Sequence, residues 1–590
     1  MHPLDYTVFS LYLLGIFAVG VGLAWKNRSA EDMFAAGGES PWWTSGLSGF
    51  MTMFSAGTFV VWGGIAYKHG LVAVAINLCY GVAALLVGAF VARRWKRLGV
   101  NTPAKFIELR FGLGAVQFYT WAMMTFRVIG VAVSLYSLSV ILVAMMPLAE
   151  GNPLRDPATG NLSLAWAVLI FGGIVVIYTI AGGLWAVLMT DVLQFIVLNL
   201  AVLFVVPLAF AEVDGVAAFV NKAPEGFFAL TTDKYTWFFM FGWVMIHFFM
   251  VGAEWAFAQR FICVPNEKDA RKSAYLFGAL YLVSPLVWLL PPMLYRVIDP
   301  AADPEQAYIL ACRTVLPAGI VGLMVAAMFS ATASMVSSQL NVFAGVLTDQ
   351  FYRRLFSPNA SQQRLISAGR VFTALLGIVL VGVALAIPYL GGAEKLIITT
   401  ASLMVGPLLA PTIWGLFSRR VDFKAIWITA GISFVLGVVA KLGLAAEGPL
   451  TTERTQDLSD WIQTNGTTVD LVIGIVVPII VLFLLQCLAK STADGWNKVE
   501  QLVQETRSSH KRQQASSMPA MIVSGSLATC AALMFALMFW NQNERSLLGS
   551  FGAVLLLISG TIFTVLYLKR NGAYGRGNTR GNETNTSELN

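Results

Sequence analysis

Long apolar runs, about fifteen of them, constrain this chain more than any other feature of its sequence. A helix needs about 20 apolar residues to cross a bilayer core of about 30 Å. Runs that meet this requirement lie near residues 6–25, 41–67, 70–92, 115–147, 161–181, 184–210, 235–257, 274–296, 317–348, 371–393, 396–417, 425–446, 467–488, 519–540 and 547–567. Only 12% of the 590 residues are charged, whereas a soluble globular protein carries roughly 25%. Lipid must therefore be the solvent for most of the chain, and the runs predict an all-α polytopic membrane protein.

The charged residues between the runs predict how the chain is oriented. Lysine and arginine gather in alternate connectors, at Arg93, Arg94, Lys96 and Arg97, at Lys268, Arg271 and Lys272, at Arg353 and Arg354, at Arg419, Arg420 and Lys424, and in residues 489–518. The opposite connectors are acidic or neutral. Basic connectors stay in the cytoplasm. An odd number of spans then places the N-terminus outside the cell membrane and the C-terminus in the cytoplasm.

Several functional classes find no support in the sequence. The net charge of +7 is spread over short connectors, so there is no contiguous basic face and we expect no nucleic-acid partner. The five cysteines lack CxxC spacing and the four histidines are scattered, which indicates packing roles and neither a disulfide framework nor a zinc or haem centre. No catalytic motif is present, so we do not expect an enzyme.

Three charged residues inside apolar runs stand out: Arg127 in the fourth, Asp191 in the sixth and Glu254 late in the seventh. A charge at membrane depth is costly, so such residues mark functional sites by default. The alternative is a structural ion pair in the protein interior. An unpaired arginine would be strongly disfavoured there, so Arg127 must meet an anion. Glu254 and a carboxylate on the solute are the two candidates.

Two runs are rich in small polar residues. The second contains Ser55-Ala56-Gly57-Thr58, which suits a transporter helix that is unwound at its centre, where freed carbonyls can bind a cation. Close helix packing through small residues explains the same pattern equally well. In the ninth run Ala331, Ser334 and Ser338 share one helical face. Their oxygens suit an alkali cation, although membrane serines more often bond back to the preceding turn.

Four motifs, in order along the chain, resemble the sodium:solute symporter family, which includes the sodium/glucose and sodium/proline transporters. They are Pro41-Trp42-Trp43, then Gly182-Gly183-Leu184-Trp185-Ala186-Val187 leading to Thr190-Asp191 and Gln194, then Gln259-Arg260, and last a serine-rich run with Leu340-Asn341 that ends Thr348-Asp349-Gln350-Phe351-Tyr352. The similarity covers roughly residues 1–440, and the second motif is the most specific.

The resemblance implies a five-plus-five inverted-repeat transporter core with one extra N-terminal helix and about four extra C-terminal helices. The apolar runs agree with this, since five fall in each repeat. The implied organisation is an N-terminal helix and loop (1–40), a first repeat (41–210), a second repeat (235–417), accessory helices (418–488), a charged cytoplasmic linker (489–518), two last helices (519–567) and a disordered tail (568–590).

The resemblance also implies two sodium sites. The main site of the family uses carbonyls of the broken helix with a carbonyl and two hydroxyls of the serine-rich helix, at positions that correspond to Met51, Phe54, Ala331, Ser334 and Met335. Met335 departs from the pattern, because a thioether is a poor ligand for a hard cation. A second site, known in some members, corresponds to Asp191, Ser337 and Ser338. All its groups are present, so it is the site we expect to be occupied if only one is.

For the solute, the resemblance indicates a carboxylate, because Arg127 stands where carboxylate-transporting members place an arginine. A guanidinium can hold a carboxylate through two parallel hydrogen bonds. Sugar-binding relatives use a lysine and a glutamate at the positions of Tyr281 and Asn77, which argues against a sugar bound in the usual way. The candidate pocket residues are Ser55, Thr58, Asn77, Arg127 and Glu254.

These features together predict sodium-coupled import of a small polar solute by alternating access. The sodium ion, the solute and the lipid bilayer are then the partners. A proton-coupled or uncoupled carrier is one alternative, which Met335 makes credible. A transporter-like sensor is another, and a partner bound to residues 489–518 would favour it. The sequence does not name the solute, the ion stoichiometry or the oligomeric state.

Overall fold

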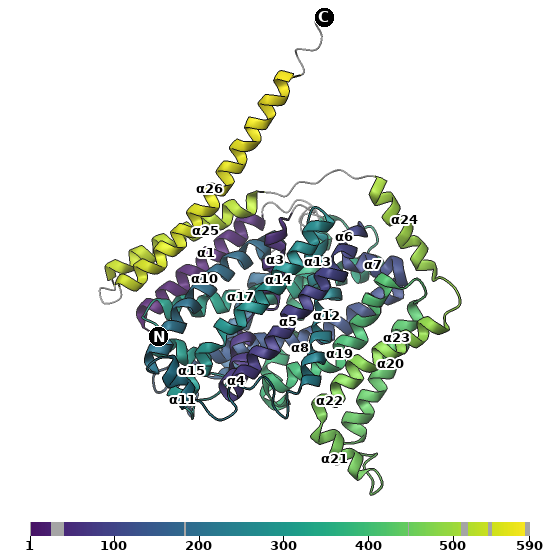
Figure 1. Ribbon diagram of the computed structural model, residues 1–590, viewed down its shortest axis with the longest axis horizontal. Helices are drawn as coiled ribbons and strands as arrows, with labels where there is room; N and C mark the ends of the chain where they lie inside the picture. Colours follow the sequence, from purple (N-terminus) through teal and green to yellow (C-terminus); the bar gives the residue numbers. More distant parts are fainter. Residues whose placement is uncertain are drawn as a thin grey trace, which may run out of the picture.

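The computed structural model is built from helices (Figure 1). It describes residues 2–24, 40–181, 184–445, 448–508, 517–540 and 545–583. Within these ranges, two isolated β-bridges in the loop after α8, Pro147 with Asn161 and Arg155 with Leu162, are the extended pairings. The long helices lie side by side and α24 lies across one end of them. The predicted all-helical class is confirmed.

Ten helices of the described residues are long and apolar enough to cross a membrane, or eleven if a bent pair counts as one span. The ten are α5 (Leu71–Phe90), α8 (Leu113–Met145), α10 (Leu184–Glu212), α14 with α15 (Glu267–Trp288, Leu290–Ile298), α17 with η3 (Ile320–Val346, Leu347–Phe356), α18 with η4 (Gln362–Ala386, Ile387–Leu390), α19 (Gly392–Phe417), α20 with η5 (Phe423–Val438, Val439–Gly443), α22 and η6 with α23 (Gly466–Leu471, Val472–Val476, Val477–Leu488) and α26 (Arg545–Glu583). The bent pair is α12 (Trp237–Ala253) with α13 (Trp255–Ile262). The chain is therefore a multi-pass membrane protein.

The other four predicted runs also contain helices, but in shorter described pieces. They are α1 (Pro3–Ala24), the divided second run, α9 (Leu164–Ala181) and α25 (Met518–Trp540). For parts of α1, α9 and α25 the structure describes the helix but not the side chains. The second run is split by a break. Fifteen spans therefore stay a prediction.

Helix α17 lies at the centre of the molecule. Every residue of its most apolar 18-residue stretch is buried, whereas 22% of the corresponding stretch of α26, at the periphery, is buried. It packs against α1, α3, α8, α9 and α10. A helix buried on every side meets other helices and not lipid. The serines of α17 therefore face protein.

Two helices of this core are broken. Helix α3 (Trp42–Thr52) ends at Thr52, and after three non-helical residues the chain resumes a helical course into η2 (Thr58–Trp62) and α4 (Gly63–His69). The second break separates α12 from α13, whose axes differ by 55°. Irregular backbone at membrane depth survives only where protein or a water-filled cavity surrounds it. The break predicted in the second run is confirmed, whereas the one between α12 and α13 was not predicted.

Several of the predicted basic connectors meet at one end of the molecule. Arg97 of α6 (Ala92–Arg97) lies 2.9 Å from Glu267 at the start of α14. Arg354 lies 3.2 Å from Glu108 of α7 (Pro103–Phe111). The predicted linker contains α24 (Asp494–Ser508), which packs on α7 at this end (Figure 1). The opposite end carries the short helices α11 (Val216–Lys222) and α21 (Gln456–Thr464). Helix α16 (Ala307–Val315) packs, like α11, against α15.

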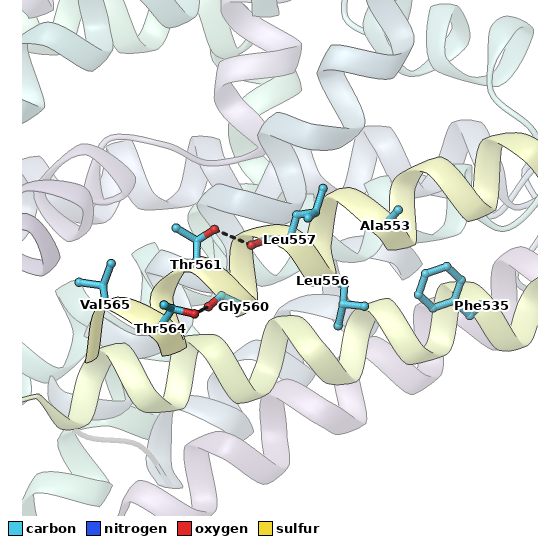
Figure 2. A pocket seen from close by; sticks show the side chains of 8 residues that line it. All are labelled: Phe535, Ala553, Leu556, Leu557, Gly560, Thr561, Thr564 and Val565. Atoms are coloured by element: carbon cyan, nitrogen blue, oxygen red, sulfur yellow. Dashed lines mark hydrogen bonds between the residues drawn. The ribbon is translucent and has the colours of Figure 1, made fainter. Parts of the chain in front are cut away.

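The last two helices form a hairpin beside α10 with a shallow groove on α26 (Figure 2). Two hydroxyls border the groove, and both bond back to their own helix at 2.8 Å, Thr561 to Leu557 and Thr564 to Gly560. A hydroxyl that bonds back to its own helix has its hydrogen bond satisfied and can lie in apolar surroundings. The groove thus presents an apolar surface, suited to lipid and not to a polar solute. The predicted tail begins inside α26, and its side chains beyond Leu568 lie outside the described residues.

Candidate functional site

At the break after α3, the backbone forms tight turns with bonds between residues three apart, in place of the bonds between residues four apart that a regular α-helix makes. The Met51 carbonyl accepts from Phe54 N at 3.0 Å, and the Ser55 carbonyl accepts from Thr58 N at 2.9 Å. Ser55 N donates to the Thr58 hydroxyl at 3.4 Å. Ser, Gly and Thr form such a turn readily, because their side chains are small or bond to nearby backbone. The break is therefore a local property of this stretch.

Two neighbouring helices hold the break from outside. Ala56 N donates to the Thr332 hydroxyl of α17 at 2.9 Å. The Ser55 hydroxyl donates to that of Ser134 on α8 at 3.0 Å. The Ser134 hydroxyl also lies 3.2 Å from the sulfur of Met335 on α17. The break, α8 and α17 thus meet at one cluster of hydroxyls.

The candidate sodium residues lie on the elements that meet there. Met51, Phe54, Ala331, Ser334, Ser337 and Ser338 are all buried. The first two flank the break and the other four lie on α17. Asp191 belongs to α10, but its side chain lies outside the described residues. One turn further along α10, Gln194 donates to the Ser330 hydroxyl of α17 at 2.6 Å, so this part of α10 contacts the serine-rich helix.

The charged candidates Arg127 and Glu254 form a buried ion pair. Arg127 Nη2 lies 2.6 Å from Glu254 Oε2, with the two side chains 9% and 1% exposed. The guanidinium also lies 5.9 Å from the ring centroid of Phe257 on α13. The approach has no hydrogen-bond geometry, since Nε, Nη2 and Oε2 have no hydrogen-bond partner in the described structure. The anion that Arg127 requires is thus present, but the fork of the guanidinium is not filled.

Glu254 lies at the second break. It is the N-cap residue of α13, with an extended backbone (φ −66°, ψ 137°) and no side-chain cap bond. Gln259 donates to the carbonyl of Asn101 in the loop between α6 and α7 at 2.9 Å. Arg260 lies 3.4 Å from the Ser48 hydroxyl of α3. The Gln259-Arg260 motif therefore ties α13 to the first broken helix and to the end of the molecule that carries α6 and α7.

The remaining pocket candidates lie near a cluster of rings. Asn77 on α5 donates to the Ala73 carbonyl of its own helix at 2.8 Å. One turn later, Tyr80 stacks on Tyr281 with centroids 5.1 Å apart, and Tyr281 in turn meets Phe50 of α3 at 4.7 Å. Ser55 and Thr58 are joined to each other, as are Arg127 and Glu254. In the described residues no hydrogen bond joins these two pairs, or either of them to Asn77.

Sequence reasoning missed Ser134 and Ser137 on α8 and gave Thr332 no role. A signal for the serines was present, because Arg127, Gly130, Ser134 and Ser137 recur at helical spacing on a helix that is otherwise largely apolar. Thr332 stands within the serine-rich stretch, but nothing in the sequence indicates that it would meet Ala56. That contact depends on the way α17 and α3 pack.

The family model of the sodium:solute symporter family matches residues 33–427. The chain belongs to this family. It is 28% identical over 468 residues to the sodium/sialic acid symporter NanT of Aliivibrio fischeri, covering 74% of this chain and 86% of that one. It is 27% identical to the sodium/glucose cotransporter of Vibrio parahaemolyticus, covering 73% and 84%.

Solved structures agree on the fold. A substrate-bound, outward-open Na⁺-coupled sialic acid symporter matches with a TM-score of 0.62 at 22% identity, covering 81% of this chain and 97% of that one. MHP1, a nucleobase-cation-symport-1 family transporter, matches with a TM-score of 0.51 at 14% identity, covering 80% and 98%. The protein is thus a membrane transporter that imports a small solute together with sodium.

Proposed function

We propose that the solute carries a carboxylate and that Arg127 binds it. The observation that supports this is the unfilled guanidinium of Arg127, whose buried Nε and Nη2 lack hydrogen bonds in the described structure. Leaving such donors unsatisfied is costly, and a carboxylate can satisfy both with parallel bonds. A neutral sugar would leave Arg127 with Glu254 as its anion and could not hold the guanidinium through two charged bonds. The sialic acid symporters among the relatives transport an acid, which agrees with this choice.

Glu254 holds Arg127 when the solute is absent. When a solute carboxylate takes its place, Glu254 needs another partner. The N-terminus of α13 is at hand, because Glu254 is the N-cap residue there and makes no side-chain cap bond. A helix N-terminus stabilises an anion. The ion pair can therefore open without leaving Glu254 uncompensated.

Ser55, Thr58 and Asn77 would contact the rest of the solute. The two hydroxyls stand at the first break, and Asn77 stands beside the Tyr80–Tyr281 stack. Sodium would bind at the main site through Met51, Phe54, Ala331 and Ser334, and at the second site through Asp191, Ser337 and Ser338. Sodium and solute then stabilise one another by mutual coupling.

Alternating access would come from two inverted repeats, residues 41–210 and 235–417. The position of the breaks supports this division, because the first helix of each window is broken. Broken helices at corresponding positions of two repeats mark the binding site in transporters of this kind. The accessory helices 418–488, the linker 489–518, the hairpin 519–567 and the tail 568–590 lie outside the repeats.

The orientation we propose places the N-terminus outside the cell membrane and the C-terminus and linker in the cytoplasm. The gathering of basic connectors at the end that carries α6, α7 and α24 supports it. External labelling of an engineered cysteine in the linker of intact cells would contradict this orientation.

Substitution of Arg127 by lysine tests the solute class. Arg127→Lys keeps the charge but loses the two-point geometry. A screen of monocarboxylates, amino acids, sialic acids and sugars for sodium-dependent uptake into vesicles first identifies the solute. The variant should then insert normally and bind a carboxylate solute roughly 10- to 100-fold more weakly, since a hydrogen bond to a charged group contributes about 1.5–3 kcal/mol. The exposed Arg271→Lys is the matched control. Equal transport of a neutral solute by the wild type and Arg127→Ala would end the carboxylate proposal.

The second candidate function is a transporter-like sensor, and the packing of the linker limits it. Its partner would bind residues 489–518, but α24 already uses one face to pack on α7, and the ring of Trp496 lies 5.7 Å from the Arg110 guanidinium. In the described part of the linker, the face of α24 that points away from α7 is left for a partner. Transport by the purified chain in vesicles decides between the two, because a sensor need not move solute.

A further inference from the structure

We infer that the Ser134 hydroxyl on α8 supplies the sodium ligand that Met335 cannot. The inference rests on the main sodium site proposed above, with Met51, Phe54, Ala331 and Ser334 as its other ligands. The family pattern calls for a hydroxyl at position 335, and this chain has a thioether there. Sulfur of this kind suits soft metals, whereas sodium needs hard oxygen ligands. The site therefore lacks one oxygen unless another residue provides it.

Ser134 is the hydroxyl that lies where the missing one would act. Its oxygen is 3.2 Å from the Met335 sulfur and 3.0 Å from the Ser55 hydroxyl. Ser55 directly follows Phe54, whose carbonyl is one of the proposed ligands. Ser134 is thus in contact with both elements of the site, the broken helix and α17. It is itself buried, with 2% of its surface exposed.

The hydroxyl can turn its oxygen toward a cation. Ser134 lies 3.2 Å from the Gly130 carbonyl as well as from the Met335 sulfur, and its single proton can serve only one of them. When it donates to Gly130, one lone pair of its oxygen accepts from the Ser55 hydroxyl and the other is left for a cation. Methionine has three rotatable side-chain bonds, so the Met335 side chain can withdraw as the ion enters.

A second observation also indicates that this face of α8 is suited to binding an ion. The Ser137 hydroxyl is fully buried and has no hydrogen-bond partner in the described part of the chain. A β-carbon added to Gly57 would lie 3.2, 3.8 and 3.9 Å from the hydroxyls of Ser55, Ser134 and Ser137. Three hydroxyls from two elements therefore converge on one point beside the break. If these hydroxyls served packing alone, there would be no reason to leave that of Ser137 without a partner, because an unsatisfied buried hydroxyl is costly.

The test measures sodium binding without transport. The purified full-length chain is heated in increasing NaCl, with choline chloride keeping ionic strength constant, and the sodium concentration that raises the melting temperature by a fixed amount is read out. Ser134→Ala should raise that concentration about tenfold, the effect of losing roughly 1.4 kcal/mol of ligand binding. Ser134→Thr, which keeps the hydroxyl, should stay within about threefold of the wild type. Measuring the same variants in an Asp191→Asn background isolates the main site.

The decisive variant restores the family pattern. Ser134→Ala combined with Met335→Ser should recover sodium binding, because the hydroxyl returns to position 335. Ser139→Ala is the matched control, since among the described residues its buried hydroxyl bonds to Leu135 of the same helix, at 3.0 Å; it should leave the thermal shift unchanged. Failure of Met335→Ser to rescue Ser134→Ala overturns the inference.

Ser334→Ala separates this inference from the proposed site. If Ser334→Ala weakens sodium binding and Ser134→Ala does not, the site stands and the role of Ser134 is wrong. If neither variant changes the sodium concentration needed for that fixed rise in melting temperature, the main site itself is wrong, and the inference falls with it.

Discussion

The two broken helices of the core are stabilised in opposite ways. At the break after α3, neutral groups meet the freed backbone, through Ala56 N with Thr332 and the Ser55 hydroxyl with Ser134. At the break between α12 and α13, a full charge stands at the bend, and Glu254 is neutralised by Arg127. Neutral hydroxyls can exchange partners at small cost, whereas a buried charge can move only if a counter-charge replaces it. The first break is suited to a cation that enters and leaves, and the second to an exchange between anions.

The largest expected effect comes from removing one half of the charged pair. Glu254→Ala should lower the stability of the solubilised protein by about 3–5 kcal/mol, because it leaves a buried guanidinium uncompensated. The double variant Arg127→Leu with Glu254→Leu should recover most of the loss, although it would not bind a carboxylate. Thermal unfolding in detergent, at constant sodium, measures both.

Lys222→Ala is the control for that comparison. Lys222 and Asp214 form an exposed pair at 3.2 Å, with side chains 53% and 80% exposed, and such pairs contribute little stability. If Glu254→Ala is as mild as this control, the second break does not depend on its charge and the contrast between the breaks disappears.

A smaller effect is expected at the neutral break. Thr332→Val keeps the shape of the side chain but removes the acceptor of Ala56 N, and it should cost about 1–3 kcal/mol. Thr373→Val on α18 is the control, since the hydrogen bond that the structure describes for the buried Thr373 hydroxyl goes to Gly369 of its own helix at 2.9 Å. Thermal unfolding of the two variants gives the difference. Equal losses in both would mean that Thr332 does not support the break.

Much of the architecture could be predicted from local pattern, because bilayer thickness sets the length of each apolar run. The first break was not decided by local pattern, since Ser, Gly and Thr suit close helix packing as well as an unwound helix, and it was the family resemblance that implied a broken helix. The second break carried a weaker signal. Gly252 and Ala253 precede Glu254 in a run of large apolar residues, but nothing in that string indicates a bend of 55°.

The candidate site also has features that the sequence alone determines and others that depend on the tertiary structure. The sequence by itself determined that Arg127 needs an anion, because an unpaired charge in an apolar helix is too costly to keep. It also indicated that Met335 is a poor ligand for sodium, since sulfur chemistry does not depend on the fold. Only the tertiary structure decided that the anion is Glu254 and that Ser134 lies beside Met335, 201 positions further along the chain. Contacts between helices far apart in sequence depend on which faces pack together, and each face alone is compatible with many partners.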